Sequence, residues 1–353
     1  MIELFDNNMQ NNPLVSVVMP VLNTEKYVAK AVESILSQNY THFEFIIIDD
    51  GSTDNTGKIL ESFCDPRISI IKNKKSQGVA LSLNLGLSCA KGEFIIRQDA
   101  DDISLPNRIK KQLSYLVDHP DIGVLGSWFQ YIDNDGNYIS KGCRNRENYQ
   151  LKWDLLFTCP LAHPTTAMRK DILEEIGGYR NYETEDYDLW ARLYEKTRFA
   201  NLPEVMVLYR RHVGSKTVKY KNIHNLHAFE IMMNLRSQLI NRTITEQEKV
   251  WLGQSFFQRK IENASGVESN ANFILELMAN YLSRNAFSEQ EIKWIKQDCA
   301  KYLFLLAYDN QINSLPTSKR IMRNSFIMYP RLMFSRRAFE VFIGFKLTKS
   351  AIS

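Results

Sequence analysis

Apolar runs alternate with helix-period segments along the first third of the chain. Short runs rich in β-branched residues are typical of buried strands. They predict four strands, at Leu14–Met19, Phe43–Ile48, Ile68–Ile71 and Glu93–Arg97. Apolar residues at helical spacing predict intervening helices at Glu25–Ser37, Asp54–Phe63 and Val79–Cys89, and a further helix from Pro106 to about Val117. This order predicts an α/β domain with a mostly parallel sheet and helices on both faces.

Longer helical patterns replace the strand signals from about residue 218. His224–Leu239 and Glu246–Gln258 show this change most clearly. We therefore expect a disordered polar tail at 1–12, a first domain at 13–217 and a helical C-terminal region at 218–353.

Composition narrows the class of protein without selecting a function. The five cysteines are scattered, odd in number and without a CxxC pair, which argues against a disulfide framework or a zinc site and suits a reducing cytosol. The N-terminus lacks the basic start and apolar run of a signal peptide, and no stretch reaches the ~18 apolar residues of a membrane span. The net charge of +4 is modest. We expect a cytoplasmic protein.

Acidic residues follow the fourth predicted strand. Asp99, Asp101 and Asp102 put three carboxylates into four residues, and a hard divalent cation such as Mg²⁺ or Mn²⁺ would relieve their repulsion. The same acids would also suit the first turn of the helix that is expected after Pro106. The motif alone leaves both interpretations open.

A second acidic cluster, the pair Asp49 and Asp50, lies at the end of the second predicted strand. Because the carboxyl ends of parallel strands meet at one edge of a sheet, both acidic groups are expected to face one crevice. A carboxylate there can accept the N–H of a nucleobase. The following residues, Gly51-Ser52-Thr53-Asp54, also favour a turn and a helix cap, so both roles are expected here.

Seven segments, in order, resemble the inverting glycosyltransferases of family 2. They are VSVVMPVLNTEKYVAKAVESILSQNY, FEFIIIDDGSTDNT, QGVALSLNLGLSCAKGEFIIRQDADD, LPNRIKKQ, AHPTTAMRK, GGYRNYETEDYDLWARL and LYRRHVGSKT. The resemblance covers residues 13–215. It implies the GT-A fold, a Rossmann-like α/β domain with a mostly parallel mixed sheet, here followed by a C-terminal helical appendage. It also implies transfer of a sugar from a nucleotide donor to an acceptor hydroxyl.

The resemblance assigns donor-binding residues by position. The implied set is Pro20, Val21, Asn23, Asp50, Gly78, Asp99 and Ala100. In it, Asp50 would accept the uracil N3–H, Gly78 would pass the ribose and diphosphate, and Asp99 would face the ribose. Asp102 is expected to orient the loop.

The metal site and the catalytic base are likewise implied by the resemblance. Asp101 and His212 would be ligands of Mn²⁺ or Mg²⁺, although a lone histidine on a basic loop is often structural or solvated. Asp186 would be the base that deprotonates the acceptor hydroxyl. Its neighbours suit helix capping as well, and Glu185 and Asp188 are the alternative bases.

Three residues depart from the family pattern. Gln77 stands where Asn is common, and Arg97 and Gln98 stand where an apolar or aromatic pair is common. These departures bear on the fine geometry of the donor pocket rather than on the activity.

Basic and aromatic residues are interleaved between Pro316 and Lys349, where eight lysines and arginines accompany one acid, Glu340. This mixture is typical of interfacial helices on an anionic membrane, where each basic residue contributes about 1 kcal/mol. A helical cap that packs its aromatics inward would use the same residues. Nothing else in the sequence favours binding to nucleic acid.

The resemblance also implies a class of substrate. Similar enzymes build surface polysaccharides on polyprenyl-diphosphate carriers at the cytoplasmic face of the inner membrane, and ETEDYDLW resembles a segment of O-antigen enzymes. We expect a UDP-hexose donor, glucose or galactose first, and a β-1,3 linkage to lipid-linked N-acetylglucosamine. A non-catalytic nucleotide-sugar- or carbohydrate-binding partner of another transferase is the alternative. Pro-Val-Leu-Asn after the first strand disfavours a nucleotidyltransferase or a dinucleotide dehydrogenase, which need a Gly-rich loop there.

Overall fold

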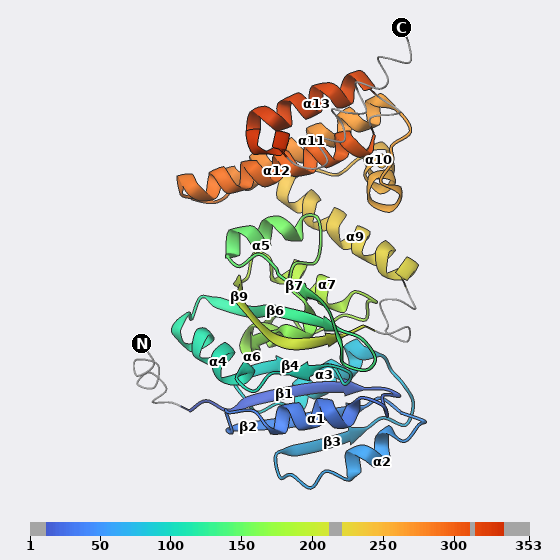
Figure 1. The fold of residues 1–353 in the computed structure, drawn as a ribbon, viewed down its shortest axis with the longest axis vertical. Helices are drawn as coiled ribbons and strands as arrows, with labels where there is room; N and C mark the ends of the chain where they lie inside the picture. Colours follow the sequence, from blue (N-terminus) through green and yellow to red (C-terminus); the bar gives the residue numbers. More distant parts are fainter. Residues whose placement is uncertain (1–11, 212–220, 311–314, 335–353) are drawn as a thin grey trace. The chain divides into compact units, whose positions relative to one another are not determined.

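The computed structural model describes residues 12–211, 221–310 and 315–334. The chain divides into two compact units, 1–228 and 229–353, and each is described by itself. Figure 1 shows that the strands belong to the first unit and that the second is built from helices.

A nine-stranded sheet forms the centre of the first unit. Its strands are β1 (Val15–Val21), β2 (Phe43–Asp49), β3 (Ile68–Lys72), β4 (Phe94–Arg97), β5 (Ile103–Ser104), β6 (Ile122–Ile132), β7 (Tyr138–Gly142), β8 (Ala167–Arg169) and β9 (Arg198–Arg210). Their order is β3-β2-β1-β4-β8-β6-β9-β5, and β7 pairs with β6. The four strands expected from the apolar runs are β1 to β4.

Parallel pairing brings the two acidic groups to one edge of the sheet. β1 pairs in parallel with both β2 and β4, and Val21 lies beside Asp49 where β1 and β2 end. Nearly all residues of these strands are buried, as expected for strands covered on both faces. Because the strands run in the same direction, Asp50 and Asp99 leave the sheet on the same side.

Antiparallel strands complete the sheet. β8 lies antiparallel between β4 and β6, while β9 runs parallel to β6. The short strand β5 pairs with β9, with Ile103 beside Leu208. This pairing holds the acidic loop that precedes β5 against the end of β9. The expected mixed α/β sheet is confirmed, with β5, β7 and β8 as its antiparallel part.

Helices cover the sheet. Those of the first unit are α1 (Val28–Leu36), α2 (Thr56–Glu61), α3 (Val79–Cys89), α4 (Arg108–Asp118), α5 (Asn148–Leu155), α6 (Lys170–Glu175) and α7 (Glu185–Leu193), with a 3-10 turn, η1 (His163–Thr165). α3 packs on β1 and β2, and Gly86 allows this close approach, since a Cβ there would lie 2.4 Å from Val18 Cγ1. The helix expected from Pro106 begins at Arg108 and packs on β6 and β9.

The second unit confirms the expected C-terminal helices. They are α9 (Lys221–Ile240), which begins in the first unit, α10 (Glu246–Gly253), the π-helical turn η2 (Gln254–Gln258), α11 (Ala264–Ser283), α12 (Glu289–Asp309), α13 (Leu315–Met328) and the 3-10 turn η3 (Pro330–Phe334). α12 begins with a capping box between Ser288 and Glu291. Within the described ranges, no helix is long and apolar enough to cross a membrane.

Candidate active site

The loops that follow β1 and β2 are joined by hydrogen bonds. Asn23 has a left-handed backbone (φ 51°), which asparagine tolerates, and its Oδ1 accepts the Thr53 N–H at 2.8 Å. Its own N–H donates to Ser52 Oγ at 3.0 Å. Pro20 and Val21 end β1 directly before this loop. The donor-site residues expected at the end of β1 therefore lie on or beside two loops that hydrogen bonds hold together.

The carboxylate of Asp50 is enclosed by the loop that precedes α3. Both of its oxygens accept the Gln77 N–H at 3.0 Å, and Oδ2 also accepts the Gly78 N–H at 2.9 Å. Asn73 Nδ2 donates to Oδ1 and Ser76 Oγ donates to Oδ2, each at 2.7 Å. Asp50 therefore fastens this loop to the end of β2.

These contacts fix the charge of Asp50. Burial by itself would raise the pKa of Asp50, but hydrogen bonds from Gln77, Ser76 and Asn73 outweigh it and lower the pKa. The acceptor positions of the carboxylate are largely occupied, so a nucleobase N–H would share or replace one of these bonds. Gly78 has φ 95°, a conformation that favours glycine, and this turn directs its N–H to Asp50.

Three carboxylates gather in the loop between β4 and β5. One oxygen each of Asp99, Asp101 and Asp102 lie within 4.8 Å of one another, around the buried Ala100. Asp102 Oδ1 accepts the Arg210 N–H at 2.7 Å, whereas Oδ2 is buried with no hydrogen-bond partner among the described residues. Clustered carboxylate oxygens, one of them unpartnered, fit a hard divalent cation such as Mn²⁺ or Mg²⁺.

Desolvation dominates the electrostatics of this loop. Burial raises the pKa of Asp102 well above its ordinary value, and Asp101 and Asp99 raise it further. Burial also raises the pKa of Asp99, while the Arg97 guanidinium opposes that shift. A cation bound in the loop would relieve both the desolvation and the repulsion.

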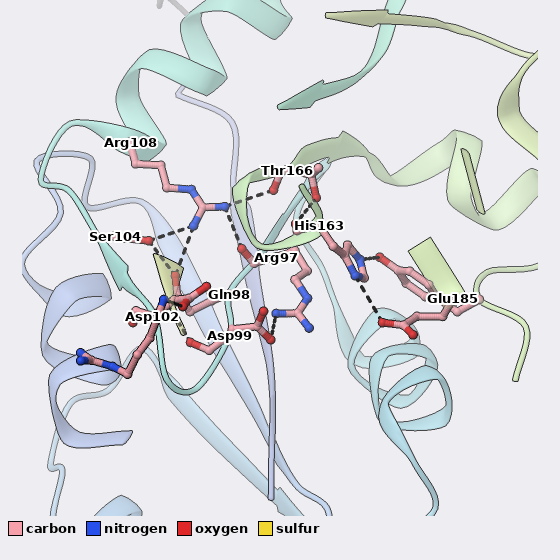
Figure 2. Close-up of polar contacts among 11 residues, drawn as sticks. Arg97, Gln98, Asp99, Asp102, Ser104, Arg108, His163, Thr166 and Glu185 are labelled. Carbon is pink, nitrogen blue, oxygen red and sulfur yellow. Dashed lines mark hydrogen bonds and ion pairs between the residues drawn. The ribbon is translucent and has the colours of Figure 1, made fainter. Parts of the chain in front are cut away.

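A buried amide and a buried arginine hold the acidic loop in shape, as Figure 2 shows. Gln98 Nε2 donates to the carbonyl oxygens of Asp99 and Asp102, at 2.8 and 3.0 Å. Its Oε1 accepts from Ser104 Oγ at 2.6 Å and from Arg108 Nη1 at 3.2 Å. Arg108 is fully buried, and burial lowers its pKa to about 9. Gln98 thus has a structural role that explains its departure from the family pattern.

Arg97 forms an ion pair with Asp99 inside the protein (Figure 2). Its side chain is buried, and its Nε has no hydrogen-bond partner among the described residues. Burial by itself would lower the pKa of Arg97, but the charges of Asp99 and Glu185 outweigh it and raise the pKa. The guanidinium therefore acts electrostatically on both the acidic loop and the start of α7.

Asp186 lies in the first turn of α7, close to Cys159. Its Oδ1 accepts the Tyr187 N–H at 2.8 Å, and the Cys159 thiol donates to Oδ2 at 3.6 Å. Burial raises the pKa of Asp186, and Glu185 raises it further, while His163 lowers it. Burial also raises the pKa of the Cys159 thiol, which therefore stays a donor. A carboxylate with a raised pKa at this place suits a general base.

A second set of polar contacts holds the start of α7. His163 Nδ1 lies 3.6 Å from Glu185 Oε1 (Figure 2). Its Nε2 lies 3.1 Å from the Tyr179 hydroxyl. Asp188 pairs with Arg192 Nε at 2.7 Å. Of the three acids in this turn, Glu185 thus has the His163 imidazole as a partner, and Asp188 has the Arg192 guanidinium, one turn further along α7.

Some residues of this site carry no sequence signal of their own. Cys159 stands in no pattern that distinguishes it, because its role depends on contacts distant in sequence. Arg108 lies in the family-like segment LPNRIKKQ, but nothing in that segment marks its side chain as buried. His163 belongs to the family-like segment AHPTTAMRK, which is a signal that could have singled it out. His212, expected as a metal ligand, lies outside the described residues.

Comparison with known proteins identifies the class of enzyme. The model of the family described as Glycosyl transferase family 2 matches residues 16–177. An uncharacterized glycosyltransferase of Haemophilus influenzae is 34% identical over 247 residues, which are 66% of this chain and 76% of that protein. The chain belongs to glycosyltransferase family 2. A further relative of this glycosyltransferase is the O-antigen biosynthesis glycosyltransferase WbnJ of Escherichia coli, 32% identical over 239 residues, 66% of this chain and 91% of WbnJ.

The fold agrees with this family. The crystal structure of S. aureus TarS 1–349 in complex with UDP-GlcNAc aligns with a TM-score of 0.54 and covers 88% of this chain and 90% of that chain. At 18% sequence identity this likeness establishes the fold alone. The expected GT-A architecture of the glycosyltransferase is confirmed.

Proposed function

We propose that this glycosyltransferase transfers a hexose, glucose or galactose in first place, from a UDP-sugar to a sugar hydroxyl of a lipid-linked acceptor, with a bound divalent metal ion and with inversion. The observation that carries the proposal is the proximity of the acidic loop to the start of α7, where the half-buried Asp186 lies. Arg97 contacts Asp99 and acts electrostatically on Glu185, the neighbour of Asp186.

The donor would lie over the strand ends. Pro20, Val21 and Asn23 would contact the uridine, with Asp50 accepting the uracil N3–H. Gly78 is near the loop that precedes α7, the helix that carries Asp186. A Cβ on Gly78 would lie 4.0 Å from Asn181 Oδ1 in that loop. A diphosphate passing Gly78 would therefore run toward Asp186. Asp99 and Ala100 would border the ribose.

The acidic loop would hold the cation. Asp101 and His212 are the proposed ligands, with Mn²⁺ or Mg²⁺ as the metal, and the unpartnered Asp102 oxygen supports a site of this charge. When bound, the cation supplies Lewis-acid stabilisation of the charge that develops on the departing diphosphate.

Asp186 would act as the base. Its carboxylate takes the proton of the acceptor hydroxyl as that oxygen forms a bond to the anomeric carbon of the donor sugar. The bond from the anomeric carbon to the diphosphate breaks in the same step, and UDP leaves. A single in-line displacement inverts the anomeric configuration, so an α-linked donor gives a β-linked product.

The acceptor is proposed as an N-acetylglucosamine-diphospho-undecaprenol-like molecule in O-antigen or capsule synthesis, with a β-1,3 linkage. Support comes from a relative, WbnJ, whose name assigns it to O-antigen biosynthesis. A lipid-linked acceptor would require the enzyme to work as a peripheral protein on the cytoplasmic face of the inner membrane.

An anionic membrane surface is the proposed partner of α13. Arg323 and Ile327 are exposed on α13, and Arg331 and Met333 are exposed on η3, which follows it. The exposed fractions of Ile327 and Met333 are 70% and 45%. Exposed cations beside exposed apolar side chains suit the headgroup region of a membrane. The part of the basic segment from residue 335 onward lies outside the described residues.

The experiment that tests the proposal is a product analysis by ¹H NMR. UDP-glucose and UDP-galactose would each be incubated with enzyme, Mn²⁺ and a synthetic N-acetylglucosamine-diphospho-lipid. We expect one new anomeric signal with the large coupling of a β-hexoside. An α-linked product would refute inversion, and UDP binding without any product from either donor would favour the alternative, a non-catalytic partner of another transferase.

A further inference from the structure

Three arginines surround the three acids of the loop between β4 and β5, among the residues that the structure describes. Arg97 pairs with Asp99. Arg210 donates from Nε to the Asp101 carbonyl oxygen at 2.9 Å and from its backbone N–H to Asp102 Oδ1 at 2.7 Å. The third, Arg108, is joined to the loop through Gln98 and Ser104.

These arginines cannot leave the loop without breaking the fold. Arg97, Arg108 and Arg210 are 4%, 0% and 3% exposed, respectively. Arg108 also donates to the carbonyl oxygens of Arg97 and Thr166, at 2.8 and 3.3 Å. Arg210 Nη1 donates to the carbonyl oxygen of Asp133 at 2.7 Å. Their guanidinium groups are therefore held in place at the site.

Formal charges of the three acids and the three arginines cancel. A divalent cation that arrives alone meets oxygen ligands but little net attraction, because Arg97 pairs with Asp99 and the Arg210 guanidinium lies at the Asp101 carbonyl oxygen. A nucleoside diphosphate brings its own negative charge and further oxygen ligands. The cation then binds the loop and the diphosphate together.

We propose that Arg97 is a positioning residue that holds Asp99 in place and makes cation binding at this loop depend on the nucleoside diphosphate. The proposal rests on the proposed function, which places the diphosphate at this loop. Of the three arginines, Arg97 is the one whose side chain pairs directly with an acid of the loop. It thereby couples two ligands energetically, and each must strengthen the binding of the other.

The size of the effect follows from Coulomb's law. A unit charge roughly 6 Å from a divalent ion changes its affinity by about tenfold even at the dielectric constant of water, and by more inside a protein. Removing the charge of Arg97 should therefore strengthen the binding of a cation alone, whereas a general loss of structure would weaken it. This difference in sign separates a charge role from a merely structural one.

The test measures Mn²⁺ binding from the loss of the free-ion EPR signal, with and without saturating UDP. We expect the wild-type protein to bind Mn²⁺ at least about tenfold more tightly with UDP. In Arg97→Met, Mn²⁺ alone should bind at least about tenfold more tightly than it does to wild type, so that UDP adds less. Arg97→Lys keeps the charge and should keep the dependence on UDP. Arg198→Met, at the opposite end of β9 and 59% exposed, is the matched control and should match wild type.

Each other outcome contradicts the proposal. Equally tight Mn²⁺ binding to the wild-type protein with and without UDP overturns it, and this measurement does not depend on the folding of a variant. Weaker binding of Mn²⁺ alone to a folded Arg97→Met protein overturns it too. Failure of the proposed function has a different signature, namely that calorimetry detects no UDP binding to the wild-type protein with Mn²⁺ present.

Discussion

The carboxylate of Asp50 accepts the backbone N–H of Gly78 at 2.9 Å, and this bond joins the end of β2 to the loop before α3. Through this contact the carboxylate holds the loop before α3 in place, and it is also the proposed hydrogen-bond acceptor for uracil. Both roles depend on two negatively charged oxygens, because the loop directs backbone N–H groups at each of them.

Asp50→Asn replaces one of these oxygens with an amide nitrogen that repels the loop N–H groups. Each buried donor left unpaired costs about 1–3 kcal/mol. We expect the KM for the UDP-sugar to rise about tenfold or more, with kcat changed less. Steady-state kinetics with varied donor measures this. Asp65→Asn, which weakens a partly buried pair with Arg67, should leave the KM unchanged. An unchanged KM in Asp50→Asn would show that the loop does not need the carboxylate.

Asp186 and Asp188 lie on the same turn of α7 and should respond differently to the same change. Asp186→Asn removes the proposed base, and we expect kcat to fall by about 10²–10⁴-fold with UDP binding retained. Asp188→Asn weakens the pair with Arg192 and should lower the melting temperature, with a smaller loss of kcat. Single-turnover kinetics and thermal unfolding measure the two effects. Full turnover in Asp186→Asn would contradict the assignment of the base.

The pH dependence of turnover should report the raised pKa of Asp186. The base acts when deprotonated, so kcat/KM rises with pH as Asp186 loses its proton. Because burial and Glu185 raise this pKa, the rise should occur above the ordinary aspartate value of about 4. Cys159→Ala removes the thiol that donates to Asp186 and should move the rise to still higher pH. Cys143→Ala, at an exposed cysteine, should leave the profile unchanged. A rise at or below the ordinary value would refute the raised pKa.

Arg108 should matter for stability more than any exposed arginine. Arg108→Met leaves Gln98 Oε1 and the carbonyl oxygens of Arg97 and Thr166 without this donor. We expect the free energy of unfolding to fall by about 3 kcal/mol or more, since each unsatisfied buried group costs about 1–3 kcal/mol. Urea denaturation measures it. Arg198→Met, which breaks an exposed pair with Asp121, should cost less than about 1 kcal/mol. Equal losses would mean that the buried network contributes little.

The sequence predicts the parallel part of the fold well, because each buried strand has a continuous apolar run that can be recognised without knowing its partners. β1 to β4 arise from continuous apolar runs, and the acids that follow β2 and β4 were placed at one edge by the direction of the strands alone. The antiparallel part could not be predicted in this way. β8 has three residues, and its place between β4 and β6 depends on partners far away in the chain.

The candidate site was predictable where it follows motifs and not where it depends on packing. The acidic loop and Asp186 stand in recognisable segments. Arg108 looks like any basic residue of an amphipathic helix, although its side chain is fully buried beneath the loop. Arg97 and Gln98 can be recognised from the sequence as departures from the family pattern. Their roles become clear only from their contacts with the acidic loop in the folded protein.

Acceptor-dependent release of UDP tests the central claim most directly. The wild-type protein, Mn²⁺ and a panel of UDP- and GDP-sugars would be assayed for free nucleoside diphosphate, with and without a synthetic N-acetylglucosamine-diphospho-lipid. We predict rapid release from one UDP-hexose that requires the acceptor and stops when EDTA removes the metal ion. Full release in the presence of EDTA would contradict the metal role of the acidic loop. Release from no donor, in a protein that binds UDP, would contradict glycosyl transfer by this site.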